Sequence, residues 1–164
     1  MSGGRTMMIL LWNMIGIGLH IALFVLDRTS KHYVTHHNTP VAITSFLDCQ
    51  IAYNTGISWS LFSTTNPWFY TFISGFILLG LVAIALFTIK RLKHHKLVIG
   101  ELLILSGGLS NFIDRCRYGH VIDFISIHYK NWHFPIFNLA DVAIVSGVLI
   151  IFISVQCNVD NYVE

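Results

Sequence analysis

Four apolar stretches divide the chain, each about 17–22 residues long, close to the ~20 residues that cross the hydrocarbon core of a bilayer. They cover residues 7–26, 68–89, 97–113 and 136–155. The second stretch carries no charged side chain and no polar face at the helical period, which excludes a helix of a water-soluble bundle. Because backbone groups in lipid must bond within their own segment, the pattern predicts four transmembrane helices.

A longer polar segment, residues 27–67, separates the first two stretches. It is too long to be a structureless loop in a compact domain. Within it, residues 41–53 mix β-branched and aromatic residues with polar ones, which predicts a small sheet. We therefore expect one integral membrane domain over residues 1–164, an all-α membrane protein with four transmembrane helices and a small extracytoplasmic β-sheet.

Composition agrees with a membrane protein. The chain is 54% hydrophobic and 11% charged, with a mean hydropathy of +0.66, whereas soluble domains carry about 25% charged residues. The formal net charge of +2 is too small to suggest a nucleic-acid partner. The first apolar stretch is longer than the core of a signal peptide, and no small-residue cleavage site follows it, so we expect an uncleaved span.

Charge gives a partial answer about orientation. Four spans place both termini on one side, and the strongly basic connection 90–96 assigns that side to the cytoplasm by the positive-inside rule. A count of all Lys and Arg residues gives five on each side, however. The density of the short connection favours cytoplasmic termini, but the total charge leaves the orientation open.

The cysteines and histidines do not predict a metal site. Cys49, Cys116 and Cys157 lack metal-ligand spacing and form no Cys-x-x-Cys pair. A disulfide between Cys49 and Cys116 is one alternative, and a role as small apolar filling residues is the preferred one. The histidines lack the His-Glu-x-x-His spacing of zinc hydrolases. We expect no metal and no cofactor.

Two carboxylates in apolar company are the candidate chemistry. Asp123 lies between two apolar residues, and Asp141 lies near the start of the last apolar stretch. An ionised side chain at a membrane boundary is costly, which makes it a functional hypothesis. Asp141 also stands three residues after Asn138, as in an ordinary helix cap. If the two acids meet, the helix end favours ionised Asp141 and the apolar flanks favour protonated Asp123.

Further polar residues fall on the same predicted side of the membrane. Asp27 and Lys31 have the i, i+4 spacing of a helical ion pair, either on the surface or in support of the site. Asp114 and Arg115 close the third stretch, either as an interfacial pair or with Arg115 neutralising a nearby acid or holding a substrate carbonyl. Glu101 lies inside the third stretch and needs a partner or a cavity.

Two glycine-containing motifs have structural interpretations. Asn54 and Gly56 frame a predicted turn, because Asn and Gly tolerate the left-handed region. Gly107 and Gly108 predict a close approach between the third helix and a neighbour.

Five motifs occur in order over about residues 27–147. They begin at Asp27, Asn54, Gly108, Val121 and Phe137, and read Asp-Arg-Thr-Ser-Lys, Asn-Thr-Gly-Ile-Ser-Trp, Gly-Leu-Ser-Asn-Phe-Ile-Asp-Arg, Val-Ile-Asp-Phe and Phe-Asn-Leu-Ala-Asp. Each is weak alone, but together they resemble bacterial lipoprotein signal peptidase (signal peptidase II). The resemblance implies a membrane aspartyl protease with four spans in the bacterial cytoplasmic (inner) membrane. It also implies cytoplasmic termini and a site near the outer face.

The resemblance assigns roles residue by residue. It implies that Asp123 and Asp141 are the catalytic dyad. The residues that it implies for substrate binding or support of the site are Asp27, Lys31, Asn54, Gly56, Asn111, Asp114, Arg115 and Asn138. The implied substrate is a prolipoprotein whose cysteine already carries diacylglycerol, cut just before that cysteine. The other implied partners are membrane lipids and globomycin-type cyclic peptide inhibitors, and we expect a monomer.

Four positions depart from the family pattern. Arg28 replaces the usual Gln, Ser58 a common Ala, Ser110 a common Gly, and Ser126 a frequent acid. None of the four is a dyad residue, so they bear on substrate preference and not on the reaction.

The alternative from another class is a small membrane transporter or ion-conducting subunit, which also places acids in membrane spans. In that class the acids usually lie near the membrane midplane. Here they cluster at one boundary, which favours the enzyme.

Overall fold

The computed structural model describes residues 2–37, 40–56 and 66–156. Four helices and four strands follow one another in the described chain. In chain order they are α1 (Ser2–His37), β1 (Val41–Ala42), β2 (Leu47–Asn54), α2 (Pro67–Lys93), α3 (Ile99–Tyr118), β3 (Val121–Tyr129), β4 (Trp132–His133) and α4 (Leu139–Gln156). Cys157 and Ser58, together with the end of the motif that begins at Asn54, lie outside the described residues.

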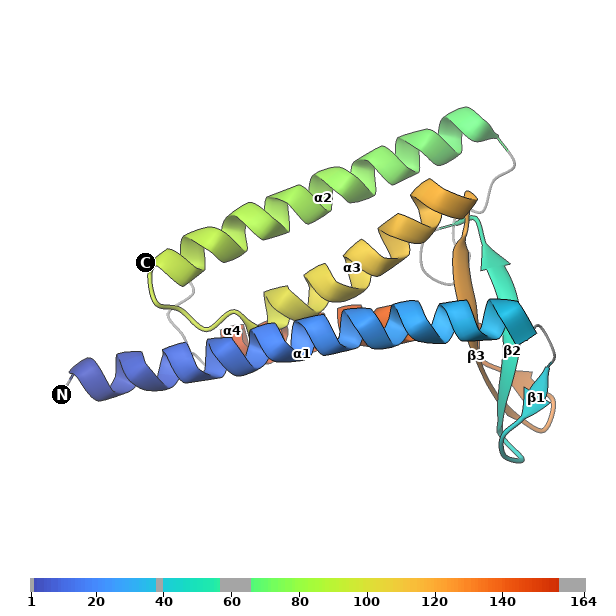
Figure 1. Cartoon of the computed structure of the whole chain (residues 1–164), viewed down its shortest axis with the longest axis horizontal. Helices are drawn as coiled ribbons and strands as arrows, with labels where there is room; N and C mark the ends of the chain where they lie inside the picture. Colours follow the sequence, from blue (N-terminus) through green and yellow to red (C-terminus); the bar gives the residue numbers. More distant parts are fainter. Residues whose placement is uncertain (1, 38–39, 57–65, 157–164) are drawn as a thin grey trace.

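The helices lie alongside one another, and the sheet sits at one end of them (Figure 1). α3 contacts α1, α2 and α4, so it is the centre of the bundle. Its sequence explains this position, because it has more buried residues than any other helix, including Gly107, Gly108 and Ser110. Small side chains let neighbouring helices approach closely.

Three of the four helices are long and apolar enough to cross a membrane. They are α1, α2 and α4, and they confirm that three of the predicted spans are helices with the length and apolar composition of a membrane span. α3 coincides with the third predicted stretch, residues 97–113, but it is not among the described helices that are long and apolar enough to cross a membrane. α1 continues to His37, so the first part of the predicted outer segment is helical.

Glycines fix the distance between α3 and α4. A Cβ atom on Gly107 would overlap the backbone carbonyl of Ala140, and a Cβ on Gly147 would come within 2.5 Å of the Gly100 carbonyl oxygen. Two helix backbones are therefore in direct contact at two levels. This confirms the close approach predicted from the glycines of the third stretch.

The sheet is antiparallel, in the order β1-β2-β3-β4. The sheet predicted at residues 41–53 is confirmed as β1 and β2, but the prediction lacked β3 and β4. α3 ends at Gly119, whose φ of 74° is in the left-handed region that glycine adopts readily, and the chain then enters β3. The register of β2 against β3 shifts between Cys49 and Ala52, and Ala52 is the residue that pairs with Asp123.

The end of the bundle opposite the sheet is held by a buried ion pair. Arg91 Nε lies 2.8 Å from Glu101 Oε1, and both side chains are buried. Asn13 of α1 donates to the carbonyl of Lys96 over 2.9 Å and accepts from the Val98 amide over 3.0 Å. Glu101 therefore has a partner, and the connection between α2 and α3 is bound to α1.

The disulfide alternative is wrong for this structure. Cys49 and Cys116 are both free thiols, with Cys49 half-buried in β2 and Cys116 exposed on α3.

Candidate active site

Asp123 lies in β3, and its carboxylate is buried between two amide side chains. Asn54 of β2 donates to Oδ2 over 3.1 Å, and Asn138 donates to Oδ1 over 2.6 Å. The side chain is only 2% exposed. β2 and β3 are paired here, with Ala52 opposite Asp123, so the sheet itself brings Asn54 and Asp123 together.

Asp141 lies in the first turn of α4 and forms a reciprocal cap with Asn138. The Asp141 amide donates to Asn138 Oδ1 over 2.9 Å, and the Asn138 amide donates to Asp141 Oδ2 over 3.3 Å. Such a capping arrangement satisfies backbone donors that have no partner inside the helix. The interpretation of Asp141 as a cap is therefore correct, and it also fixes the carboxylate at the helix end.

Asn138 connects the two carboxylates. It is fully buried, and its Nδ2 group donates to Asp123 while its Oδ1 accepts from the Asp141 amide. The same Nδ2 group lies 3.2 Å from Asn111 Oδ1. Asn111 in turn donates to Asp141 Oδ1 over 2.9 Å. Two carboxylates and two amides thus form one continuous network.

A buried lysine fixes the orientation of Asn111. Lys31 Nζ lies 2.7 Å from Asn111 Oδ1, 2.8 Å from Asp27 Oδ2 and 2.8 Å from Asp114 Oδ2. An ammonium group has three N–H donors, and each has an acceptor here. Because Asn111 Oδ1 faces the ammonium, its Nδ2 group faces Asp141. The i, i+4 pair of Asp27 and Lys31 is confirmed, but it is buried and not on the surface.

Two departures from the family pattern complete the same ion cluster. Arg28 pairs with Asp114 Oδ1, and Ser110 Oγ donates to Asp27 Oδ2 over 2.6 Å. The second Asp27 oxygen accepts from the Ala140 amide over 2.9 Å. Asp27 therefore ties α1 to α3 and to the start of α4, one residue before Asp141. Neither Arg28 nor Ser110 was predicted as a site residue, and their departures from the pattern were the available signal.

The environment of Asp123 changes its acidity. Burial, and after it the neighbouring charge of Asp141, raise the pKa of Asp123 from 3.8 to about 7. The amide donors of Asn54 and Asn138 and the charge of Lys31 act in the opposite direction, because they stabilise the ionised form. The net effect favours a protonated Asp123 near neutral pH, in agreement with the expectation from its apolar flanks.

Arg115 faces a pocket beside the dyad. Arg115 Nη2 donates to the carbonyl of Gly56, while Nη1 is buried and has no hydrogen-bond partner among the described residues. The Gly56 amide donates to Asn54 Oδ1 over 2.9 Å, which confirms the predicted turn. The pocket has a volume of about 210 Å³. It is lined by Asn54, Ile77, Gly108, Asn111, Arg115, Val121, Asp141 and Ile144.

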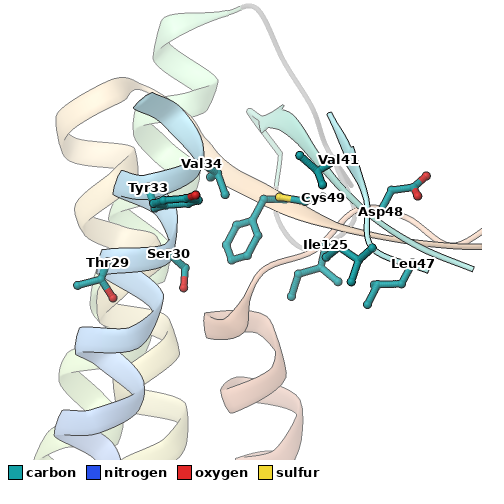
Figure 2. A pocket seen from close by; sticks show the side chains of 11 residues that line it. Thr29, Ser30, Tyr33, Val34, Val41, Leu47, Asp48, Cys49 and Ile125 are labelled. Carbon is teal, nitrogen blue, oxygen red and sulfur yellow. The ribbon is translucent and has the colours of Figure 1, made fainter. Parts of the chain in front are cut away.

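Two other pockets flank the site. A pocket of about 240 Å³ has Asp141 in its wall, together with Phe134, Phe137, Val142, Val145 and Ser146. A larger one, about 730 Å³, lies between α1 and the sheet (Figure 2). Tyr33 of α1 and Leu47, Cys49 and Ile125 of the sheet are among its walls, but neither Asp123 nor Asp141 is.

All ten predicted site residues lie in a single network of hydrogen bonds and ion pairs. Topology predicted that Asp27, Asp114 and Asp141 share one side of the membrane, and only the motifs grouped all ten residues, which lie on or next to α1, β2, α3, β3 and α4. The pocket residues Ile77 and Ile144 were missed, since an apolar residue in an apolar helix carries no separate signal.

Fold and site together define a multi-pass membrane enzyme with a buried pair of carboxylates at one end of its helical bundle. The family model for signal peptidase (SPase) II matches residues 19–157. The chain belongs to the signal peptidase II family. It is therefore a multi-pass protease of the bacterial inner membrane, and the transporter alternative is not favoured.

Individual relatives agree with the family match. Lipoprotein signal peptidase of Coxiella burnetii (strain Dugway) is 35% identical over 139 residues, which are 82% of this chain and 85% of that relative. The Burkholderia multivorans lipoprotein signal peptidase is 38% identical over 144 residues, 84% of this chain and 83% of the relative. A solved bacterial membrane enzyme, determined by the in meso method, has a TM-score of 0.69 and 27% identity, covering 86% of this chain and 92% of its own.

Proposed function

We propose that the chain removes signal peptides from diacylglyceryl-modified prolipoproteins as an aspartic endopeptidase, with Asp123 and Asp141 as its catalytic dyad. The observation that carries the proposal is the shared network of the two carboxylates, in which Asn138 holds one and caps the helix of the other. Two carboxylates in one poorly hydrated space titrate as a pair, so that one stays protonated while the other is ionised.

The proposed reaction uses one proton on the pair. Asp141, at the start of α4, is the ionised base, because a helix N-terminus favours negative charge. It takes a proton from water as the water oxygen attacks the scissile carbonyl carbon. Protonated Asp123 gives its proton to the carbonyl oxygen as negative charge develops there. As the C–N bond breaks, Asp141 passes the proton that it took from water to the amide nitrogen, and the new carboxyl group returns a proton to Asp123.

The neighbouring polar groups position the substrate and the dyad. Arg115 Nη1 points to a role in holding a substrate carbonyl, because an unpaired buried donor is costly and a peptide oxygen would satisfy it. Asn54, Asn111 and Asn138 hold the two carboxylates. The ion cluster around Lys31 supports Asn111 without reaching the reacting atoms.

The proposed orientation puts all four helices across the membrane, with both termini in the cytoplasm and the site near the outer face. α3 is the third of these spans, and at about 1.5 Å per residue its 20 residues reach about 30 Å. The sheet and the dyad lie at the end of the bundle opposite the basic connection between α2 and α3. Membrane lipids surround the bundle, globomycin-type peptides bind at the dyad, and the enzyme acts as a monomer.

The test is cleavage of a lipidated precursor peptide in detergent by purified variants. We expect Asp123→Asn and Asp141→Asn each to lower kcat by about 10²–10⁴-fold, because each removes a general acid or base. Asp48→Asn is the matched control: it removes a carboxylate of the same sheet that pairs with His128 over 2.9 Å, and it should cleave at the wild-type rate. More than about a tenth of wild-type activity in either dyad variant would remove that aspartate from the mechanism.

A further inference from the structure

Asp141 stands in the walls of two pockets with different chemistry. The pocket that also contains Arg115 presents amide and guanidinium donors from Asn54, Asn111 and Arg115. The other is lined by Phe134, Phe137, Asp141, Val142, Val145 and Ser146, and we call it the Phe137 groove. The first suits a peptide backbone, which needs hydrogen-bond donors, and the second suits an apolar group.

The Phe137 groove lies along α4, one of the apolar helices that are long enough to cross a membrane. The rings of Phe134 and Phe137 meet edge to face, with their centroids 5.7 Å apart, and both residues line the groove. Val142 and Val145 are 45% and 54% exposed, so the groove is open to the outside of the bundle. Its polar lining residues are Ser146 and Asp141.

We propose that the Phe137 groove binds the thioether-linked glyceryl group of the substrate cysteine and the first methylenes of its acyl chains. The inference rests on the proposed function, which places the scissile amide at the dyad. In a precursor cut before the lipidated cysteine, that amide nitrogen is joined to the lipid-bearing sulfur through only Cα and Cβ. The lipid must therefore begin beside the dyad, and Asp141 is one of the residues that line the Phe137 groove.

Its size and position also set how much of the lipid it holds. At about 240 Å³ it is smaller than the 300–1,000 Å³ of a pocket that encloses a drug-sized ligand. It thus holds the part of the lipid nearest the sulfur, and the rest of each chain lies in the bilayer. The larger pocket between α1 and the sheet has more room, but neither dyad carboxylate lies in its wall (Figure 2).

Photocrosslinking tests the assignment without relying on activity. The probe is a precursor peptide with a diazirine in the acyl chain, a few methylenes from the ester carbonyl, bound to the full-length Asp123→Asn variant so that it stays intact. We expect the label on residues 134–146. Label on Val41, Ile43 or Leu47 would place the lipid in the larger pocket instead. Equal label at Val145 and Val148 would show ordinary lipid contact, and either result would overturn the proposal.

Kinetics provide the second readout, as the ratio of kcat/KM for lipidated peptide to that for unlipidated peptide. Val145→Trp fills the groove and should lower this ratio about tenfold, equivalent to lost contact with about two methylenes. Val145→Ala, which cannot overpack the site, should lower it less. The matched control is Val148→Trp, since Val148 is 51% exposed on the same helix outside the groove. It should keep the wild-type ratio.

These outcomes separate the groove from the proposed function. An equal loss of the kcat/KM ratio in Val145→Trp and Val148→Trp would contradict lipid binding in the groove and would leave the proposed protease activity unaffected. If the wild-type protein fails to cleave the lipidated peptide, the proposed function fails, and the crosslinked residues still decide whether the groove binds lipid.

Discussion

The side chain of Asn138 has two functions, and a different atom carries each of them. Its oxygen accepts from the Asp141 amide and so caps α4, while its NH₂ group donates to Asp123 over 2.6 Å. Serine is also a good N-cap but has no second donor to reach Asp123. A substitution can therefore remove one task and keep the other.

We expect Asn138→Ser to keep most of the stability of the protein and to lower kcat about tenfold. Loss of the donor should also raise the pKa of Asp123 and move the alkaline limb of the pH profile to higher pH, because that hydrogen bond stabilises the ionised form. Asn138→Ala, which removes the cap as well, should cost a further ~1 kcal/mol of stability. Thermal unfolding and a pH–rate profile measure both effects. An unshifted profile in Asn138→Ser would contradict the role of the donor.

The raised pKa of Asp123 predicts a pH dependence of the wild-type enzyme. The dyad works with one proton, and that proton leaves as the pH rises through about 7. We expect kcat/KM to fall above that pH, approaching about tenfold per pH unit. A flat profile up to about pH 9 would show that the dyad keeps its proton by other means.

The same proton affects stability in a defined direction. The folded chain binds it more tightly than the unfolded chain does, so this group makes the protein less stable as the pH rises from about 4 to about 7. Asp123→Asn removes this dependence, and its midpoint of thermal unfolding should change less over that range than that of the wild type.

At the scale of secondary-structure elements, the contact between α3 and α4 holds the dyad in place. Gly107 lies against the Ala140 backbone, and Ala140 is the neighbour of Asp141. We expect Gly107→Ala to push the helices apart, to cost about 1–3 kcal/mol of stability and to lower the cleavage rate. Gly75→Ala is the control, because a Cβ atom there meets nothing within 4 Å. Equal unfolding temperatures in the two variants would contradict the close contact.

The elements also show how far the sequence can predict this structure. Helix positions follow from apolar length, and the pair of Asp27 and Lys31 follows from helical spacing. β3 was missed because the first residues of this strand are buried without alternation. A short buried segment of this kind can be a strand or a helix, and the sequence pattern does not distinguish the two. No strand was therefore predicted around Asp123. Its partner Asn54 lies 69 residues away, and only the pairing of β2 with β3 brings them together.

At the scale of the whole molecule, the dyad and the basic connection lie at opposite ends. In a variant without its three native cysteines, single cysteines at Trp132 and His94 report on the two ends. We expect a membrane-impermeant maleimide to label Trp132→Cys on intact spheroplasts, and His94→Cys only after permeabilisation. Both residues are exposed in the structure, so a lack of label reflects the membrane and not burial. The reverse labelling pattern would invert the proposed orientation.

The helices of the bundle are packed against one another unequally. α3 and α4 touch through their backbones, whereas α2 packs mainly on α3 and buries little besides Ile73, Thr88 and Arg91. The pocket beside the dyad has Ile77 of α2 on one side and Ile144 of α4 on the other. Widening that pocket is therefore a displacement of α2. A compound that fills this pocket between Ile77 and Ile144 would join α2 to α4 beside Asp141, and it needs no contact with Asp123, which does not line the pocket.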